Sequence, residues 1–309
     1  MSALSRRLGE FGYAAGWSLT RRLPESLGAM LFGLGADVAV RRGGGGVRQL
    51  RANLARVVPQ ADETELDELV RQAMRSYARY WYETFRLPAM DRDTVIGKVG
   101  AKITGVENID AALAEGNGAV CALPHSGNWD AAGVWMADYL GSFTTVVERL
   151  EPESVYRRFV AFRESLGFEI VPLTGDSAAM RVLLKRLREN KVVCLVGDRD
   201  LTASGLPVKF FGDRARMPAG PARLAATTGA ALLPVGSWFT EDGWQMRVHP
   251  RIRVTARAEV PAATQALADV FAGDIAAHPA DWHMLQKFWL SDLEAGESAD
   301  SAGLEEAAS

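Results

Sequence analysis

Short apolar runs alternate with helix-like patterns through the central part of the chain, from residue 97 to residue 237. The apolar runs are residues 119–123, 144–147, 169–172, 192–196 and 231–235, and the helical patterns are residues 131–140, 154–166, 178–190 and 218–228, with longer ones at 64–86 and 261–277. Parallel strands need crossover connections, which are usually helices, so this alternation is typical of a parallel sheet. We therefore expect an α/β fold with a central, mostly parallel sheet flanked by helices.

Both ends of the chain differ in composition from this central part. We expect amphipathic helices in residues 1–42, a flexible glycine-rich loop at residues 43–46, and one large α/β domain over residues 47–291. Residues 292–309 contain six acidic residues and no basic ones, together with many small residues. Such a segment cannot bury enough apolar surface to fold, which predicts a disordered tail.

Positive charge gathers in the first 56 residues, although the whole chain has a net charge of −3. Nine arginines and no lysine stand there against three acidic residues, a net charge of +6, and Phe11, Trp17 and Phe32 lie among them. No stretch reaches the ~18–20 uncharged apolar residues that a spanning helix needs. We therefore expect a peripheral protein on an anionic membrane surface, with two ordinary helices packed on the core as the alternative.

A histidine and an aspartate lie five residues apart in the segment His-Ser-Gly-Asn-Trp-Asp, from His125 to Asp130. The segment follows an apolar run and precedes a helical pattern, so we expect His125 in a loop and Asp130 in a first helical turn, with Ser126 or Asn128 as the N-cap. A carboxylate that accepts from one imidazole nitrogen leaves the other free as a general base. The pair is predicted to deprotonate a hydroxyl, with Asp130 orienting His125; a capping loop with a structural histidine is the alternative.

This motif is one of several blocks that are distributed along the chain. They are YARYWYETFRL at residues 77–87, PHSGNWD at 124–130, VGDRD at 196–200, PAGPARLA at 218–225 followed by TGA at 228–230, and PADWH at 279–283 followed by Phe288-Trp289. In this order, over about residues 50–290, they resemble the lysophospholipid acyltransferase superfamily. The branch is that of the bacterial lipid A late acyltransferases and phosphatidylinositol mannoside acyltransferases. The resemblance implies an acyl-CoA-dependent O-acyltransferase.

The resemblance also implies roles for charged residues. It places the first acid of the 196–200 block, Asp198, near the catalytic histidine, with Asp200 as the other candidate. Both acids follow a strand-like run, and active sites of open α/β sheets lie at the carboxyl ends of the strands. Glu148 and Arg149 match a family position that lines the acceptor site.

Further candidate substrate contacts come from polar residues near the motif. We expect the Arg163 guanidinium to bind a phosphate in bidentate fashion, and Ser126 and Asn128 to contact substrate. Acyl-CoA is a co-substrate, and neither a cofactor nor a metal is expected. Cys121 and Cys194 lie in apolar runs and are predicted to be buried free thiols.

The favoured acceptor is a phosphatidylinositol mannoside, acylated on a mannose hydroxyl by a palmitoyl-like chain. This choice depends on Asp130, where many lipid A acyltransferases have Glu, and on the N-terminus without a clear spanning helix. A lipid A-type acceptor is the runner-up. We expect the protein on the cytoplasmic face of the bacterial plasma membrane, without a nucleic-acid partner and with its oligomeric state open. A lipid hydrolase would need a nucleophile, and no Gly-x-Ser-x-Gly elbow occurs; a non-catalytic lipid-binding protein also remains an alternative.

Overall fold

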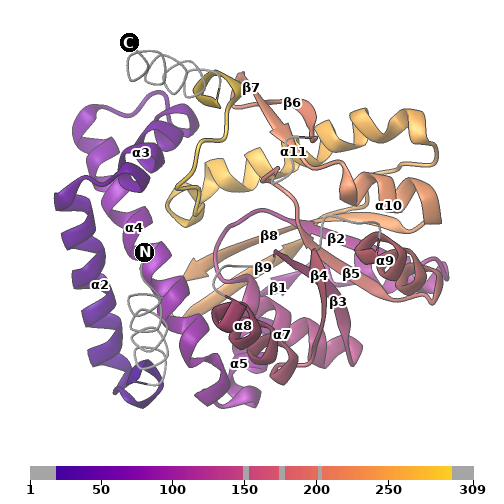
Figure 1. The fold of residues 1–309 in the computed structure, drawn as a ribbon, viewed down its shortest axis with the longest axis horizontal. Helices are drawn as coiled ribbons and strands as arrows, with labels where there is room; N and C mark the ends of the chain where they lie inside the picture. The colour runs from indigo at the N-terminus through magenta and orange to yellow at the C-terminus, as the bar shows by residue number, and fades with distance from the viewer. Residues whose placement is uncertain (1–18, 149–152, 174–177, 201–203, 294–309) are drawn as a thin grey trace, which may run out of the picture.

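A central sheet with helices on both faces forms the body of the molecule, and three helices from the N-terminal part pack at one end of it (Figure 1). The computed structural model describes residues 19–148, 153–173, 178–200 and 204–293. The predicted α/β class with a mostly parallel sheet is confirmed. Most of the predicted acidic tail and the first 18 residues of the predicted membrane segment lie outside the described residues, so the domain boundaries stay predictions.

Helices and strands follow one another in the order that the alternating pattern predicts, with some additions. The helices are α2 (Glu25–Arg42), α3 (Gly45–Val57), α4 (Glu63–Arg86), α5 (Arg92–Gly100), α6 (Glu107–Ala114), α7 (Trp129–Leu140), α8 (Glu153–Ser165), α9 (Ala178–Arg188), α10 (Gly220–Thr228) and α11 (Val260–Ala277), with the short 3-10 helices η1 (Leu87–Ala89), η2 (Arg257–Glu259) and η3 (Pro279–Asp281). The strands are β1 (Ile103–Thr104), β2 (Ala119–Leu123), β3 (Phe143–Glu148), β4 (Phe168–Leu173), β5 (Val192–Val196), β6 (Leu206–Phe210), β7 (Asp213–Met217), β8 (Ala231–Thr240) and β9 (Gly243–Val248).

The main sheet has seven strands in the order β1-β9-β8-β2-β5-β3-β4. The five strands from β8 to β4 are parallel, whereas β9 runs antiparallel to β8, and β6 and β7 form a separate hairpin. Side chains of β2 alternate between two cores: Cys121 and Leu123 face the core of α5–α8, and Val120 and Ala122 face that of α9–α11. A strand buried on both faces explains why its sequence is continuously apolar.

The structure differs from the expectations in the length of β8 and in the loop between α2 and α3. β8 continues five residues beyond the expected strand, because its second half pairs with β9, whose own sequence alternates too weakly to be noticed. The expected loop at residues 43–46 is shorter, since α3 already begins at Gly45. Gly43 ends α2 with a left-handed φ of 59°, a conformation that favours glycine.

Helices α2, α3 and α4 form a separate small core around Leu50, Leu54 and Val70. Gly28 allows α2 to lie close to α4, because an added Cβ would overlap the Tyr82 ring. On the opposite side, α2 exposes a stripe of apolar side chains at helical spacing: Leu27, Met30, Leu31, Leu34 and Val38. Across the described part of the chain, every helix is too short or too polar to cross a membrane.

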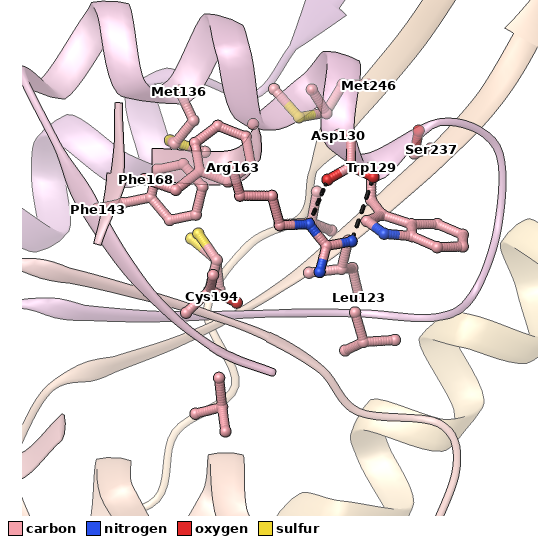
Figure 2. Close-up of a pocket in the computed structure, with 17 residues that line it drawn as sticks. Leu123, Trp129, Asp130, Met136, Phe143, Arg163, Phe168, Cys194, Ser237 and Met246 are labelled. Carbon is pink, nitrogen blue, oxygen red and sulfur yellow. Dashed lines mark hydrogen bonds and ion pairs between the residues drawn. The ribbon is translucent and has the colours of Figure 1, made fainter. Parts of the chain in front are cut away.

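An apolar cavity lies between α7 and the sheet (Figure 2). Strands β2, β3 and β5 supply its floor, and Met136 of α7 lies at its inner end with Phe143 and Phe168. The rings of Phe143 and Phe168, the first residues of paired strands, are 4.7 Å apart. From Trp129 to Met136 the cavity follows α7 for about 10 Å, given the rise of 1.5 Å per helical residue. It is therefore a narrow and mostly apolar space of about 80 Å³ inside the α7 core.

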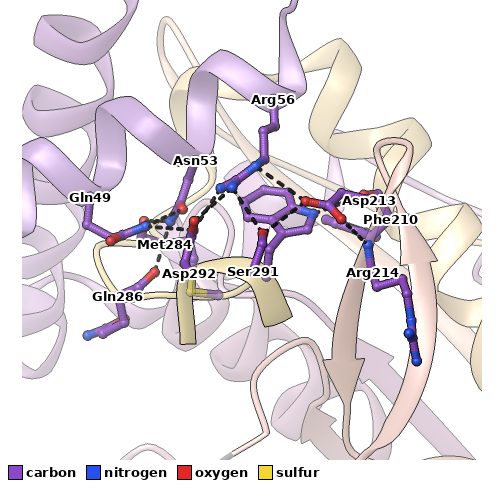
Figure 3. Close-up of polar contacts among 11 residues, drawn as sticks. Gln49, Asn53, Arg56, Phe210, Asp213, Arg214, Met284, Gln286, Ser291 and Asp292 are labelled. Carbon is purple, nitrogen blue, oxygen red and sulfur yellow. Dashed lines mark hydrogen bonds and ion pairs between the residues drawn. The ribbon is translucent and has the colours of Figure 1, made fainter. Parts of the chain in front are cut away.

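The last described segment of the chain is anchored to α3 by polar contacts (Figure 3). The fully buried Asn53 amide donates to the backbone oxygens of Met284 and Gln286 at 2.7 and 3.0 Å. Arg56 makes a bidentate pair with Asp292, at 2.7 Å for both bonds, and lies over the Trp289 ring. These contacts fix the segment that follows η3, which in turn reaches the centre of the molecule.

We expect Asn53→Ala to lower the free energy of unfolding by about 1–3 kcal/mol, because it removes the donor to the buried Met284 carbonyl and to the partly buried Gln286 carbonyl. Chemical denaturation monitored by tryptophan fluorescence measures the change. Gln72→Ala on the exposed face of α4 is the matched control, with an expected change within about 0.5 kcal/mol. Equal stability of the two variants would contradict an anchoring role for Asn53.

Candidate active site

Two neighbouring parallel strands carry the residues that meet in the candidate active site. β2 and β5 pair with Leu123 opposite Val196. His125 and Asp198 each follow their strand by two residues, so the same register brings them together at the carboxyl edge of the sheet. His125 Nδ1 lies 2.6 Å from Asp198 Oδ1, and the His125 backbone N–H donates to Asp198 Oδ2 at 3.0 Å. The acid beside His125 is therefore Asp198.

Asp198 is a fully buried carboxylate that also accepts from Trp282 Nε1 at 3.1 Å. Burial alone would raise the pKa of Asp198, but the charge and hydrogen bonds of His125, with the Trp282 N–H, hold this pKa below its usual value. An ionised carboxylate only accepts, so His125 carries its hydrogen on Nδ1. Within the described residues Nε2 has no hydrogen-bond partner, and the His125 side chain is 30% exposed.

The loop that carries His125 is held by the segment around η3. Gly127 N and Ser126 Oγ both donate to the backbone oxygen of Asp281, at 3.0 and 3.1 Å, and His283 N donates to His125 O at 2.8 Å. Gly127 has φ of 61°, and an added Cβ would collide with the β8 backbone. Ser126 is buried. Its hydroxyl supports the loop, whereas the sequence suggested a substrate contact.

Asp130 belongs to a different network, formed with α8 and α4. Arg163 donates to its carboxylate through Nε at 2.7 Å and Nη2 at 3.2 Å (Figure 2), and the Tyr80 hydroxyl donates at 3.1 Å. Burial acts to lower the pKa of Arg163, but the Asp130 carboxylate outweighs it and raises this pKa, so Arg163 stays charged. The expectation that Asp130 orients His125 is wrong, because Asp198 occupies Nδ1. Arg163, expected to hold phosphate, is committed to Asp130.

The N-cap of α7 is Asn128, one of the two expected caps. Its side-chain oxygen accepts from Ala131 N at 3.0 Å, and its amide donates to Glu83 Oε2 at 2.8 Å. Glu83 also accepts from Trp244 Nε1 at 2.6 Å. Asn128 is fully buried, so it shapes the first turn of α7 and does not reach a ligand.

Sequence reasoning missed the supporting residues Tyr80, Glu83 and Trp282. All three lie in the blocks that carry the family resemblance, but nothing in their spacing to His125 indicated a contact. Tyr80 and Glu83 are three residues apart and therefore lie on one face of α4. This spacing is the sequence feature that could have indicated their shared role. The Tyr80 ring also stacks on Trp129 at 4.0 Å, so one face of α4 supports the whole first turn of α7.

His125 lines a cleft of about 390 Å³, a size typical of ligand sites. Aromatic side chains of α4 form one wall, and Glu148 at the end of β3 and Arg199 after β5 bring charge to it. Trp129, Arg163, Val146 and Val196 line both this cleft and the apolar cavity, so the two spaces adjoin. Asp200 does not line the cleft; it accepts from Gly205 N at 2.7 Å. Arg149 lies outside the described residues.

His283, which also lines the cleft, is a buried and neutral imidazole. Burial and, to a lesser extent, the nearby His125 together lower the pKa of His283 to about 3, against the opposing effect of the Asp198 charge. Its Nε2 contacts Ser76 Oγ at 3.0 Å, and Ser76 Oγ donates to Asp281 at 2.6 Å. His283 Nδ1 has no hydrogen-bond partner either, but it is buried, so among the described histidines of the cleft the His125–Asp198 pair is the one whose unpartnered ring nitrogen belongs to a partly exposed side chain. Such a pair can accept a proton from a bound hydroxyl.

Comparisons with known proteins identify the family of the chain. Residues 2–291 match the family model of the bacterial lipid A biosynthesis acyltransferases. A phosphatidylinositol mannoside acyltransferase of Mycolicibacterium smegmatis is 54% identical over 293 residues, which cover 94% of each chain. Two phosphatidylinositol mannoside acyltransferases of Mycobacterium tuberculosis, from strains CDC 1551 and H37Rv, are 52% identical over 94% of this chain and 92% of theirs.

The match extends over nearly the whole chain and includes the loop of His125, the acid at Asp198 and the supporting blocks on α4 and η3. The predicted enzyme class, an acyltransferase, is confirmed by the family and by the relatives. The chain belongs to the bacterial lipid A biosynthesis acyltransferase family.

Proposed function

We propose that this enzyme transfers a long-chain acyl group from acyl-CoA to a mannose hydroxyl of a phosphatidylinositol mannoside. The observation that carries the proposal is the oriented imidazole of His125 at a cleft that adjoins an apolar cavity. An alcohol and an acyl chain can meet at such a place. The names of the relatives support the mannoside acceptor, and they favour it over lipid A, the molecule in the family description.

The reaction is a single displacement at the thioester carbonyl. His125 Nε2 takes the proton of the mannose hydroxyl while its oxygen attacks, and the negative Asp198 stabilises the imidazolium that forms. The N–H groups of Trp129 and Asp130, which have no intrahelical acceptor in the first turn of α7, are suited to stabilise the oxyanion. When the tetrahedral intermediate collapses, the C–S bond breaks and the CoA thiolate takes the proton back from the imidazolium. No acyl-enzyme is formed.

The cavity beneath α7, about 80 Å³ in volume, is placed to receive one part of the donor's acyl chain, and a full long chain requires it to widen. Its lining is mostly apolar, and the Cys194 thiol at its floor is uncharged, since the hydrogen bond with Cys121 and burial raise the pKa of Cys194. The Asp130–Arg163 pair lies where cavity and cleft adjoin. A chain that enters beside this pair places its thioester next to His125.

The membrane surface is reached through α2. Its exposed stripe from Leu27 to Val38 is unlike an ordinary solvated helix face, and Arg22, Arg41 and Arg42 flank it. Apolar side chains together with flanking arginines are typical of a helix that lies on an anionic bilayer. We propose that the enzyme binds the cytoplasmic face of the plasma membrane in this way, where a glycolipid acceptor is available.

Mass spectrometry of lipid products tests the function directly. The purified enzyme is incubated with acyl-CoA and either a phosphatidylinositol mannoside, a lipid A precursor, or no acceptor. We expect acylated mannoside in the first reaction alone. Acylated lipid A precursor would favour the alternative acceptor, release of free fatty acid without an acceptor would indicate a hydrolase, and binding without turnover would indicate a lipid carrier.

His125→Ala should reduce transfer by about 10²–10⁴-fold at unchanged thermal stability, because it removes the general base. Asp198→Asn should also reduce kcat strongly, since an amide can stabilise either imidazole tautomer but not the imidazolium. Initial rates of CoA release measure both. A folded His125→Ala enzyme with near-normal turnover would remove His125 from the mechanism.

Ala132→Leu should shift the donor preference toward shorter acyl chains, because the added atoms fill the cavity. Met136→Ala at its inner end should have the opposite effect, although the lost contacts cost about 2–5 kcal/mol of stability. Rates with a series of acyl-CoA chain lengths, compared with wild type, measure the preference. If neither variant changes it, the acyl chain lies elsewhere.

Replacing Met30, Leu31 and Leu34 together with Ser should weaken co-sedimentation with anionic vesicles, because each buried apolar side chain contributes about 1.5–3 kcal/mol. Gln at Arg22, Arg41 and Arg42 should make the binding less sensitive to salt, since each arginine contributes about 1 kcal/mol near an anionic surface. Gln at Lys185 and Arg188 on α9, far from α2 in Figure 1, is the matched control. Equal binding of the Ser variant and wild type would rule out α2 as the docking helix.

A further inference from the structure

The cleft contains one positive side chain that no described residue neutralises. His125 is paired with Asp198, and Arg163 with Asp130. Arg199 follows Asp198 directly, lines the same cleft and is half-buried, yet its guanidinium makes no hydrogen bond or ion pair within the described part of the chain. We propose, on the basis of the function above, that Arg199 binds a phosphate ester of one of the two substrates.

A phosphate is the ligand that best fits such a group. The planar guanidinium presents parallel N–H donors that match two phosphate oxygens, and the resulting charge-assisted bonds are about twice as strong as neutral ones. Leaving a guanidinium half-buried and unpaired is unfavourable, so an anion that arrives with a substrate gains from a site already formed. Both substrates of the proposed reaction carry phosphate esters.

Charge within the cleft also gives the bound phosphate a direction. Glu148 lies at the end of β3, next to β5 in the sheet, and it too makes no ion pair with a described residue. Its carboxylate repels a phosphate and accepts hydrogen bonds from hydroxyl groups. We therefore expect the phosphate to contact Arg199 and not Glu148, and a hydroxyl group of the ligand to donate to Glu148.

This assignment takes over the role that the sequence suggested for Arg163. Arg163 uses Nε and Nη2 for Asp130 and would leave a buried carboxylate unpaired if it turned to a ligand. Arg199 can bind an anion without breaking any described contact. The unpaired guanidinium of Arg199 in the cleft of His125, and not that of Arg163, which is paired with Asp130, is thus the phosphate-binding group.

Arg199→Gln tests the proposal through substrates with and without phosphate. The donors are an acyl-CoA and the acyl thioester of N-acetylcysteamine, which has no phosphate; the acceptors are a phosphatidylinositol mannoside and methyl α-mannoside. We expect the KM of one phosphate-bearing substrate to rise roughly 10- to 100-fold with little change in kcat, as lost uniform binding does. The rise should disappear with its phosphate-free analogue, and Arg199→Lys should recover part of the affinity.

The two sources of phosphate give different results. A rise confined to acyl-CoA identifies the donor phosphates, and one confined to the mannoside identifies the lipid phosphodiester. Arg157→Gln is the matched control, because Arg157 is an exposed arginine of α8 paired with Glu153, and it should leave both KM values unchanged. Unchanged KM values in Arg199→Gln, or an equal rise with the phosphate-free analogues, would overturn the proposal.

A binding measurement separates this inference from the proposed function. Quenching of tryptophan fluorescence by CoA, and by phosphatidylinositol in detergent micelles, reports affinity without turnover, since Trp81 and Trp129 line the cleft. Arg199→Gln should weaken the binding of one of the two ligands at least 10-fold. Suppose that the wild type transfers no acyl group to any mannoside, but that Arg199→Gln still binds CoA or phosphatidylinositol more weakly than the wild type does. The proposed function is then refuted, whereas the phosphate site is supported. Equal affinities of variant and wild type for both ligands refute the site.

Discussion

The site depends on keeping the carboxylate of Asp198 ionised in a fully buried position. An isolated buried charge is several kcal/mol unfavourable, so it persists only where donors surround it. The three donors here come from two distant parts of the chain: the His125 ring and backbone after β2, and the Trp282 indole after η3. The same hydrogen bonds therefore stabilise the buried Asp198 charge and orient the His125 imidazole.

The second carboxylate of the motif has a structural neighbourhood of its own. Asp130 joins α7 to α8 through Arg163 and to α4 through Tyr80, and it is as deeply buried as Asp198. Removing its charge would leave Arg163 unpaired in the wall between the cleft and the apolar cavity. Loss of activity on substitution of Asp130 would thus report damage to that wall, even though the residue does not touch the imidazole.

Much of the fold follows from the sequence, and so does part of the site. The strands β2 and β5 were predicted with their observed bounds because each is a continuous apolar run between helices. His125 in a loop, Asn128 as a cap and Asp198 near His125 were predicted as well. The partner of His125 was assigned wrongly, because proximity in sequence favoured Asp130, whereas the contact is set by the register between two strands that are 73 residues apart. Long-range register is not encoded in any local pattern.

There are also physical reasons why some strands and contacts were not predicted from the sequence. β9 and the β6–β7 hairpin are antiparallel strands of mixed composition, for which single-sequence periodicity is weak. The supporting side chains Tyr80, Glu83 and Trp282 act through contacts that only the packed α4 and η3 create. The sequence therefore predicts the reactive residues of a local motif, but not the distant side chains that contact them in the folded protein.

The hydrogen bonds between the His125 loop and the segment around η3 affect the order in which the chain folds. Ser126 is tied to Asp281, 155 residues later, and Asn53 to Met284, 231 residues later. Contacts of such sequence separation form late, since the entropy of closing the loop must be lost before they can stabilise anything. During synthesis, a chain that has already exposed the apolar stripe of α2 still lacks Trp282. If α2 docks on a bilayer as proposed, the nascent protein reaches the membrane before its imidazole is aligned, and it becomes competent only when the last helix and the segment after it have docked.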